Sequence, residues 1–520
     1  MPKHLVWLAL CACFGLSACA TVQPAAKACA NWRWIGLKSS PAAPCPQVPG
    51  WKEEQLFPKL RPFEPEQKGY DQQHYLSENQ DPGKPSTAEV IQELDRFCRY
   101  EREDKKVRVF PFPAPAGLVK VDKDCAAISS SAYTGPTKKD LENASMFFLE
   151  QAGRPKLQIN NQLGVRLAFL DTQPTGMGVS TAPGNSHHGY TLTHIARQLV
   201  CSPETSNRCA AQITTRLALP ITRFNAKHRK RTRTDLVRGG YIGMQGDLAQ
   251  AITNEVDDWQ NEGSQEHLVL NLSVGWDEQL FDGLKTERIT ELRAGTQAVY
   301  QALRYAASYD VLVLAAAGNQ KACAKSTDGP LLPAAWEGTK TDEHLLYAVG
   351  GVRSNGYPLS NARHRGMPQL AAYGEVVGVT SWDPERYTAF YTGSSVATAV
   401  VSSIAAVVWD SFPDRTPSQV MQILYDGGRD LNFPADFWFG GGTAPIARRL
   451  SLCSALAEAC KNLAPCPLKS ACVPWTPEEP VPLQWASALS AKPTGKSCHP
   501  WMHPQPDDPP CLNCHEPPPR

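Results

Sequence analysis

Three apolar segments of different pattern predict the core of this chain. Residues 165–170 form a mostly apolar run that ends in Asp171, as expected for a strand that carries a carboxylate to the carboxyl edge of a parallel sheet. Residues 311–317 are apolar without interruption and lead to Asn319, which predicts a second buried strand. Residues 394–409 are rich in Ala, Val and Ser, and they predict a buried helix.

The polar residues at the ends of these elements suit acyl-transfer chemistry. Ser395 follows a Gly-led turn at the start of the predicted helix, where the helix dipole favours negative charge. A serine hydroxyl attacks a carbonyl only beside a histidine base and a donor for the developing oxyanion. Asp171 could orient the imidazole, and the amide of Asn319 could meet the oxyanion. By itself, a Gly-Ser-Ser sequence before an apolar helix is more often a helix cap than an active site.

A histidine pair upstream of a predicted helix supplies the candidate base. His187 and His188 precede Gly189, and His194 lies further along the same predicted helix. The chain therefore carries an acid, histidines, an amide donor and a serine in a fixed order.

With this order and these local contexts, the chain resembles the subtilisin-like serine peptidases. The resemblance spans about residues 155–450 and rests on five ordered blocks. The blocks are Leu170-Asp171-Thr172, His188-Gly189, Asn271-Leu272-Ser273-Val274-Gly275, Ala316-Ala317-Gly318-Asn319 and Gly393-Ser394-Ser395-Val396-Ala397-Thr398. The resemblance implies an α/β fold in which a mostly parallel sheet is flanked by helices on both faces.

The resemblance also implies the function and the roles of the site residues. An exported serine endopeptidase would use Asp171, His188 and Ser395 as its triad and Asn319 in its oxyanion hole. His188 is preferred to its neighbours because the base of the family directly precedes a glycine. The family pairs an extended substrate backbone with the strand edges that here comprise Ser273, Val274, Gly275, Ala316 and Gly318. The histidine block departs from the family pattern, so the alternative is a catalytically inactive relative that serves as a surface binding or scaffolding lipoprotein.

The first residues predict export. An apolar stretch over residues 5–16 ends in Leu16-Ser17-Ala18-Cys19, which reads as a signal peptide over residues 1–18. Its ending resembles a bacterial lipobox, in which Cys19 receives the lipid. The residue after Cys19 is not acidic, and this favours the outer membrane of the cell envelope. The alternative is ordinary secretion with cleavage after a small residue.

Changes in proline and cysteine content divide the rest of the chain into segments. Residues 19–84 are Pro-rich and are interpreted as a linker, and residues 85–154 as a small accessory domain or a prodomain. The peptidase domain follows over residues 155–450, and a Cys/Pro-rich tail covers residues 451–520. The chain has 17 cysteines, and an even number remains after signal removal and lipidation, so disulfides are expected. Two groups of cysteines are close enough in sequence to form local disulfides: Cys201 with Cys209, and Cys453, Cys460, Cys466 and Cys472.

Two further motifs, one in the tail and one basic run, each have a simpler interpretation. The tail contains Cys511, Cys514 and His515 in the spacing of a c-type haem attachment site. Its surroundings offer little apolar surface to enclose a porphyrin, so a disulfide or an opportunistic metal site is preferred to haem, and no cofactor or dedicated metal is expected. The net charge is +1, which argues against a generally polyanionic partner such as nucleic acid. The expected partners, protein or peptide substrates, are those that the resemblance implies. The basic run at residues 228–231 is interpreted as a solvated loop.

Overall fold

The computed structural model places the region predicted to be the peptidase domain, here called the peptidase region, in contact with an N-terminal sheet. All structural statements concern the described residues, which are 32–58, 60, 84–102, 115–129, 132–134, 148–153, 164–172, 188–201, 208–219, 242–263, 267–277, 289–319, 328–338, 344–359, 361–375, 377–380, 388–431 and 446–461. The predicted signal peptide, Cys19, His187, the basic run at 228–231 and the Cys511-Cys514-His515 motif lie outside them.

An eight-stranded sheet forms the centre of the molecule, in the order β17-β18-β14-β13-β12-β10-β7-β8. All its neighbouring pairs are parallel except the edge pair β17 and β18. Its strands are β7 (Val165–Asp171), β8 (Ala211–Leu217), β10 (His267–Leu272), β12 (Leu312–Ala316), β13 (Tyr347–Val352), β14 (Leu370–Tyr373), β17 (Arg429–Leu431) and β18 (Ala447–Arg449). The predicted mostly parallel α/β fold is confirmed.

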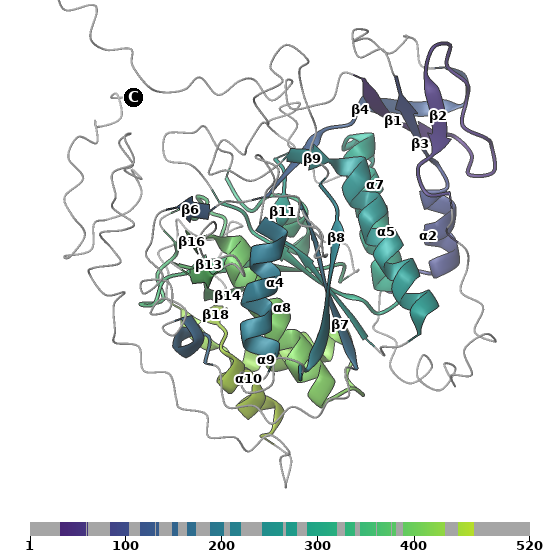
Figure 1. Cartoon of the computed structure of the whole chain (residues 1–520). Coiled ribbons are helices and arrows are strands. Elements are labelled where there is room, and N and C mark those ends of the chain that lie inside the picture. Colours follow the sequence, from purple (N-terminus) through teal and green to yellow (C-terminus); the bar gives the residue numbers. More distant parts are fainter. Residues whose placement is uncertain are drawn as a thin grey trace, which may run out of the picture.

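Helices cover both faces of this sheet (Figure 1). One face packs against α4 (His188–Val200), α8 (Ser394–Ser411), α9 (Pro417–Gly427) and α10 (Leu452–Ala459), and the other against α5 (Gln245–Glu262) and α7 (Ala294–Ser308). Successive side chains of a strand point to opposite faces. Accordingly Leu167 and Phe169 of β7 join the α8 side, whereas Ala168 and Leu170 join the α5 side.

Helix α8 runs through the middle of its layer. It is long and apolar enough to cross a membrane, but 89% of its apolar window is buried inside the protein. It also contacts β10, β12, β13 and β14 along the sheet. These contacts make it the central core helix, as its run of small apolar residues predicts.

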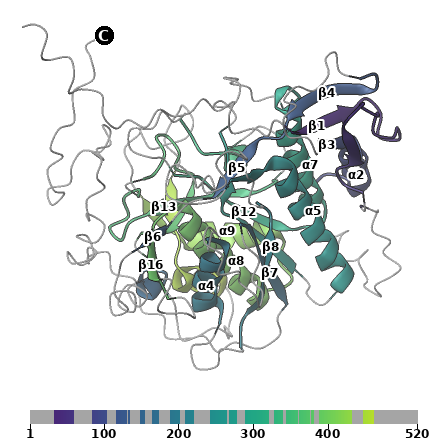
Figure 2. The ribbon, with the colours of Figure 1, turned by 45° about the horizontal axis from the view of Figure 1, so that its top comes forward.

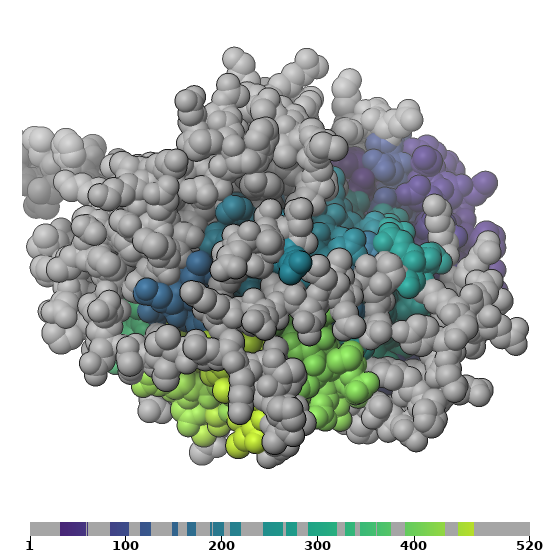
Figure 3. All heavy atoms as spheres, turned by 60° about the horizontal axis from the view of Figure 1, so that its bottom comes forward, coloured from purple at the N-terminus to yellow at the C-terminus, as the bar shows by residue number. Residues whose placement is uncertain are grey.

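A separate N-terminal sheet packs on the α7 side of the molecule. Its antiparallel strands are β1 (Arg33–Lys38), β2 (Lys52–Gln55), β3 (Phe97–Glu101) and β4 (Leu118–Lys123), and α2 (Thr87–Leu94) joins it to α7. In the space-filling view the purple residues of this sheet adjoin teal residues of the peptidase region (Figure 3).

The N-terminal sheet differs from the linker predicted over residues 19–84. Residues 33–55 contain β1 and β2, both paired with β3. Proline-rich composition obscured two short strands, although Trp34, Ile35 and Leu37 of β1 are buried. A disulfide between Cys45 and Cys98 ties the intervening loop to β3.

Two small antiparallel sheets join Ala126–Ser129 and Ala132–Thr134 to the peptidase region. In one, β5 (Ala126–Ser129) lies between β9 (Ile242–Met244) and β11 (Val274–Gly275). In the other, β16 (Thr388–Tyr391) lies between β6 (Ala132–Thr134) and β15 (Val377–Thr380). Two 3₁₀ helices, Ile289–Glu291 and Ala334–Gly338, complete the described elements.

Disulfides are present, as the cysteine usage predicts. Cys201 and Cys209 form the expected local disulfide directly after α4. Cys125, Cys453 and Cys460 are also disulfide-bonded, whereas Cys466 and Cys472 lie outside the described residues.

Candidate functional site

The best-defined part of the site is a buried pair of Asp171 and His188. Asp171 ends β7 and is 1% exposed, and His188 opens α4 and is 4% exposed. The imidazole Nδ1 lies 2.9 and 2.8 Å from the two carboxylate oxygens of Asp171. A carboxylate can only accept hydrogen bonds, so Nδ1 carries the proton and Nε2 keeps its lone pair. Thr172 donates to Asp171 from its backbone N–H at 2.6 Å and from its hydroxyl at 3.0 Å.

Strand register brings the predicted residues to one rim. Phe169 of β7 lies opposite Asn271 of β10, and Leu272 lies opposite Ala315 of β12. Because these strands are parallel, Asp171 and the residues after β10 and β12 leave the sheet at the same carboxyl edge. This edge is where open α/β sheets bind their ligands.

Ser395 is the second residue of α8 and is 3% exposed. Its Oγ lies 3.5 Å from the backbone oxygen of Ser273, and Ser273 Oγ lies 3.2 Å from the backbone oxygen of Ser395. Ser273 Oγ is also 2.8 Å from Asn271 Oδ1, and the Asn271 amide donates to Ser402 at 3.0 Å. The first turn of α8 is therefore fixed to the end of β10 by neutral hydrogen bonds.

Sequence reasoning missed the supporting roles of Asn271 and Ser402. Both are buried polar residues, Asn271 beside the apolar residues of β10 and Ser402 in the Ala- and Val-rich helix α8. Buried polar groups are nearly always hydrogen-bonded. This rule could have indicated from the sequence that each of these side chains needs a hydrogen-bond partner, and the structure shows that they bond each other.

Asn319 is held by the same turn. Its Oδ1 accepts the backbone N–H of Ser394 at 2.9 Å, and Ser394 Oγ accepts the backbone N–H of Gly318 at 3.0 Å. With Oδ1 occupied, Nδ2 is the end of the amide left to donate elsewhere. A Cβ at position 393 would lie 2.9 Å from this Nδ2, so only glycine fits here without a shift. Gly318 has φ 94°, a left-handed conformation that also favours glycine.

The start of α4 lies beside the start of α8. Thr191, one turn after His188, forms a side-chain hydrogen bond with Tyr391, which lies just before Ser395. Burial raises the pKa of Tyr391, and this hydrogen bond opposes the rise. The two helices also pack along each other. His188 and Ser395 therefore belong to the same end of the helix pair.

The other histidine of α4 does not share this position. His194 is half-buried further along the helix, and burial, together with nearby Arg197, lowers its pKa.

The predicted substrate strand is buried. Val274 and Gly275 form β11, directly after Ser273, and they pair with Ser129 and Ile128 of β5. Ala316 ends β12 and Gly318 follows it. Within the described ranges, no group of three or more His, Cys, Asp or Glu side chains could hold a metal ion.

Comparisons with known proteins identify a family model and several proteases that are similar to this chain. Residues 237–439 match the model of the subtilase family, Peptidase_S8. Mycosin-1 of Mycolicibacterium smegmatis is 27% identical over 183 residues, which are 31% of this chain and 40% of that protein. The chain thus spans less than half the length of this relative.

Solved structures of similar proteins include two proteases. The serine protease MycP1, described as an essential component of the type VII (ESX-1) secretion system, shows 20% identity and a TM-score of 0.40 over 63% of this chain and 92% of that chain. The patellamide maturation protease PatA shows 22% identity and a TM-score of 0.36 over 59% of this chain and all (100%) of that chain.

Proposed function

Because the chain carries a domain of the subtilase family, we propose that it is a subtilisin-like serine endopeptidase with Asp171, His188 and Ser395 as its triad. The observation that carries the proposal is the buried Asp171–His188 pair at 2.8 Å, since it leaves Nε2 of the imidazole ready to accept a proton. It also speaks against the inactive alternative, because a scaffolding protein has no need to fix the tautomer of a buried histidine.

In this mechanism the Ser395 hydroxyl attacks a peptide carbonyl while His188 Nε2 takes its proton. His188 then gives this proton to the leaving amine, and Asp171 stabilises the imidazolium formed in between. Asn319 Nδ2 donates to the tetrahedral oxyanion, for which its fixed Oδ1 contact with Ser394 supplies the orientation. Water then hydrolyses the acyl-enzyme by the same steps in reverse.

A fluorophosphonate probe tests this assignment. We expect labelling of mature wild-type protein and no labelling of Ser395→Ala. Ser411→Ala is the matched control, because Ser411 lies at the far end of the same helix and bonds only the Val407 carbonyl among its described contacts. Equal labelling of wild type and Ser395→Ala, or none of either mature protein, would reject the nucleophile.

We further propose that the enzyme acts in the bacterial cell envelope as a lipoprotein anchored through Cys19 to the outer membrane. The support is the lipobox-like sequence Leu16-Ser17-Ala18-Cys19. Radiolabelled palmitate should enter the wild-type protein and not Cys19→Ser. Secretion of an unlabelled wild-type protein would favour ordinary signal cleavage instead.

A further inference from the structure

A short buried segment beside the nucleophile turn has no role in the proposed mechanism. Residues 361–363, which we call the 361–363 segment, lie in the connection between β13 and β14. In Figure 2, β13 lies on the same side of the molecule as β6 and β16, away from the N-terminal sheet. All three residues are buried, and Asn361 is only 3% exposed.

Two residues of the 361–363 segment contact two different parts of the site. The Asn361 side chain donates from Nδ2 to the backbone oxygen of Thr392 at 3.4 Å, and Thr392 lies three residues before Ser395. Ala362 forms an antiparallel backbone bridge with Asn319. The segment therefore joins the oxyanion donor to the turn that presents the nucleophile.

Arg363 fixes the other end of the segment. Its Nε donates to the backbone oxygen of Gly329 at 2.6 Å, and its Nη2 lies 3.3 Å from a carboxylate oxygen of Asp277. A Cβ at Gly318 would lie 3.2 Å from Arg363 Cδ. Because Gly318 directly precedes Asn319, the aliphatic part of Arg363 packs against the backbone that carries the oxyanion donor.

These contacts form a closed ring around the nucleophile turn. Asn319 Oδ1 accepts the Ser394 N–H at 2.9 Å. The Asn319 backbone is bridged to Ala362, whose neighbour Asn361 bonds the Thr392 carbonyl. The side chain and the backbone of Asn319 are thus connected to the same turn by two different routes.

Stability alone does not explain an asparagine at position 361. A carbonyl oxygen only accepts hydrogen bonds, so Nδ2 is the end of the amide that faces Thr392. The other end, Oδ1, is buried without a hydrogen-bond partner among the described residues. A buried acceptor in this state destabilises a fold, and such departures are expected mainly at functional sites. A leucine of similar size would avoid this cost.

We infer that Asn361 is a positioning residue, which sets the spacing between Ser395 Oγ and Asn319 Nδ2 by holding the Thr392 carbonyl. The inference rests on the proposed serine peptidase function. During the proposed attack Oγ bonds to the substrate carbonyl carbon while negative charge develops on the carbonyl oxygen, which Nδ2 must meet. The two atoms therefore need a fixed spacing in the transition state.

Asn361→Leu tests this role because it removes the donor at similar volume. The substrate is a peptide that wild type cleaves, chosen from a library, and fluorophosphonate labelling to completion counts the active sites. We expect kcat per active site to fall about tenfold or more, with KM within about twofold of wild type. The melting temperature should change by less than about 4 °C.

Asn355→Leu is the matched control. Asn355 is exposed in the same connection, and its Oδ1 accepts the Tyr357 N–H at 3.1 Å, so kcat should equal that of wild type. If Asn361→Leu does not fold, Asn361→Ala serves for the same kinetic test, because it removes the donor without adding an apolar branch.

A double-mutant cycle with Asn319 separates positioning from a general effect on the fold. Asn319→Ala alone should lower kcat about 10²-fold or more. In that background Asn361→Leu should lower kcat by less than about twofold, because the amide that it positions is gone. Equal factors in the two backgrounds would overturn the inference.

The same measurements distinguish this inference from the proposed function. Wild-type kcat per active site in Asn361→Leu, whatever its KM or melting temperature, would make Asn361 a structural residue and leave the peptidase function standing. A wild type that neither hydrolyses any peptide nor is labelled by fluorophosphonate would overturn both.

Discussion

The turn that presents Ser395 is held by hydrogen bonds between neutral groups, whereas the N-terminal sheet is fastened to α5 by charges. At the rim, Asn271 bonds Ser402 and Asn319 bonds the turn before Ser395. At the other contact, Arg33 and Arg99 face Asp247 and Asp124; we call these four residues the charge cluster.

The two sets of contacts differ in how they respond to pH. Neutral hydrogen bonds keep their geometry over a wide pH range, as a preorganised site requires. The charge cluster depends on protonation, and Asp124 Oδ2 is buried without a hydrogen-bond partner among the described residues. The neutral contacts around Ser395 are thus insensitive to pH, whereas the contact between the N-terminal sheet and α5 changes with pH.

The largest effect is expected from the Asp171–His188 pair at the rim. Asp171→Asn should lower kcat about 10⁴-fold, because the amide no longer selects the Nδ1-protonated tautomer of His188. Hydrolysis of a peptide library by mature protein measures this. Asp430→Asn is the control, since Asp430 is half exposed and lies on the edge strand β17. A kcat within tenfold of wild type would show that Asp171 does not orient the base.

A loss of stability is expected when the charge cluster is broken. Asp247→Ala leaves Arg33 and Arg99 without their main shared carboxylate and should destabilise the docked N-terminal sheet by about 3 kcal/mol. Hydrogen exchange of β1 and β3 measures this.

Asp258→Ala is the matched control on the same helix. Its carboxylate is 51% exposed and pairs with Arg216, and an exposed pair contributes less than about 1 kcal/mol. Equal effects of the two variants would mean that the cluster does not fasten the sheet.

One buried acid in each region sets a pH dependence. Burial, and then nearby Asp247, raises the pKa of Asp124 to about 7 against the opposing Arg33 and Arg99. Burial raises the pKa of Glu337 to about 8, although its carboxylate accepts the Ala348 N–H. Each folded form holds its proton more tightly than the unfolded chain. The stability from each group is therefore full below about pH 4 and is lost as pH rises through the raised pKa.

Two variants separate these contributions. Asp124→Asn should flatten the fall in N-terminal sheet stability between about pH 4 and 7, and Glu337→Gln should flatten the fall in the peptidase region up to about pH 8. Urea unfolding at several pH values, followed by hydrogen exchange of β3 and β13, reports each region. An unchanged slope in Asp124→Asn would remove Asp124 as the pH-sensitive contact.

The smallest effect is expected at a helix cap distant from both contacts. Thr416 and Gln419 form a capping box at the start of α9, and the Thr416 hydroxyl accepts the Gln419 N–H at 3.3 Å. Thr416→Ala should cost about 1 kcal/mol of stability without a change in kcat. Thermal unfolding and peptide hydrolysis measure the two quantities, and a fall in kcat would connect α9 to the rim.

The local patterns of the sequence predicted the elements of the rim but not what covers it. Asp171, Asn319 and Ser395 each end or begin an apolar element, so their placement follows from hydrophobic runs and strand order. By contrast, strand β5 pairs with β9 and β11, which lie more than a hundred residues further along the chain. Such long-range pairing leaves no local signal in a short run like Ala126–Ser129.

The same limit explains the N-terminal sheet. Strand β1 is only six residues long and prolines follow it, so composition favoured a linker. Its partner β3 is supplied from the other side of residues 61–83, and no local pattern identifies that pairing.

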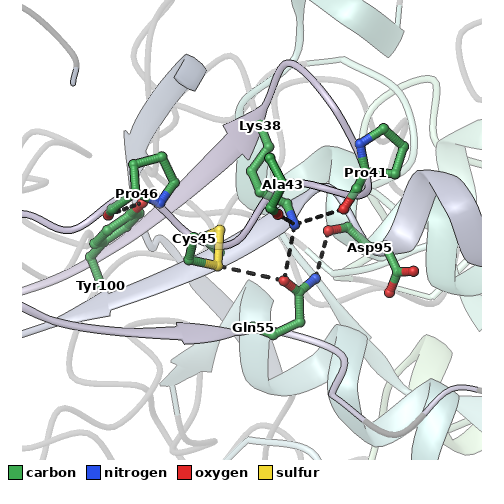
Figure 4. The surroundings of a disulfide bond; sticks show 9 residues. Lys38, Pro41, Ala43, Cys45, Pro46, Gln55, Asp95 and Tyr100 are labelled. Carbon is green, nitrogen blue, oxygen red and sulfur yellow. Dashed lines mark hydrogen bonds between the residues drawn. A yellow bond between two sulfur atoms is a disulfide. The ribbon is translucent and has the colours of Figure 1, made fainter. Parts of the chain in front are cut away.

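The bond between Cys45 and Cys98 lies in a compact setting, where Gln55 and the buried Lys38 join neighbouring loops (Figure 4). Thiols stay reduced in most cytoplasms and pair in oxidising compartments. While the chain is still among reducing agents, this cross-link would be missing and the N-terminal sheet would lack one of its ties. The tie between the loop at Cys45 and strand β3 therefore forms only in a compartment where thiols can pair.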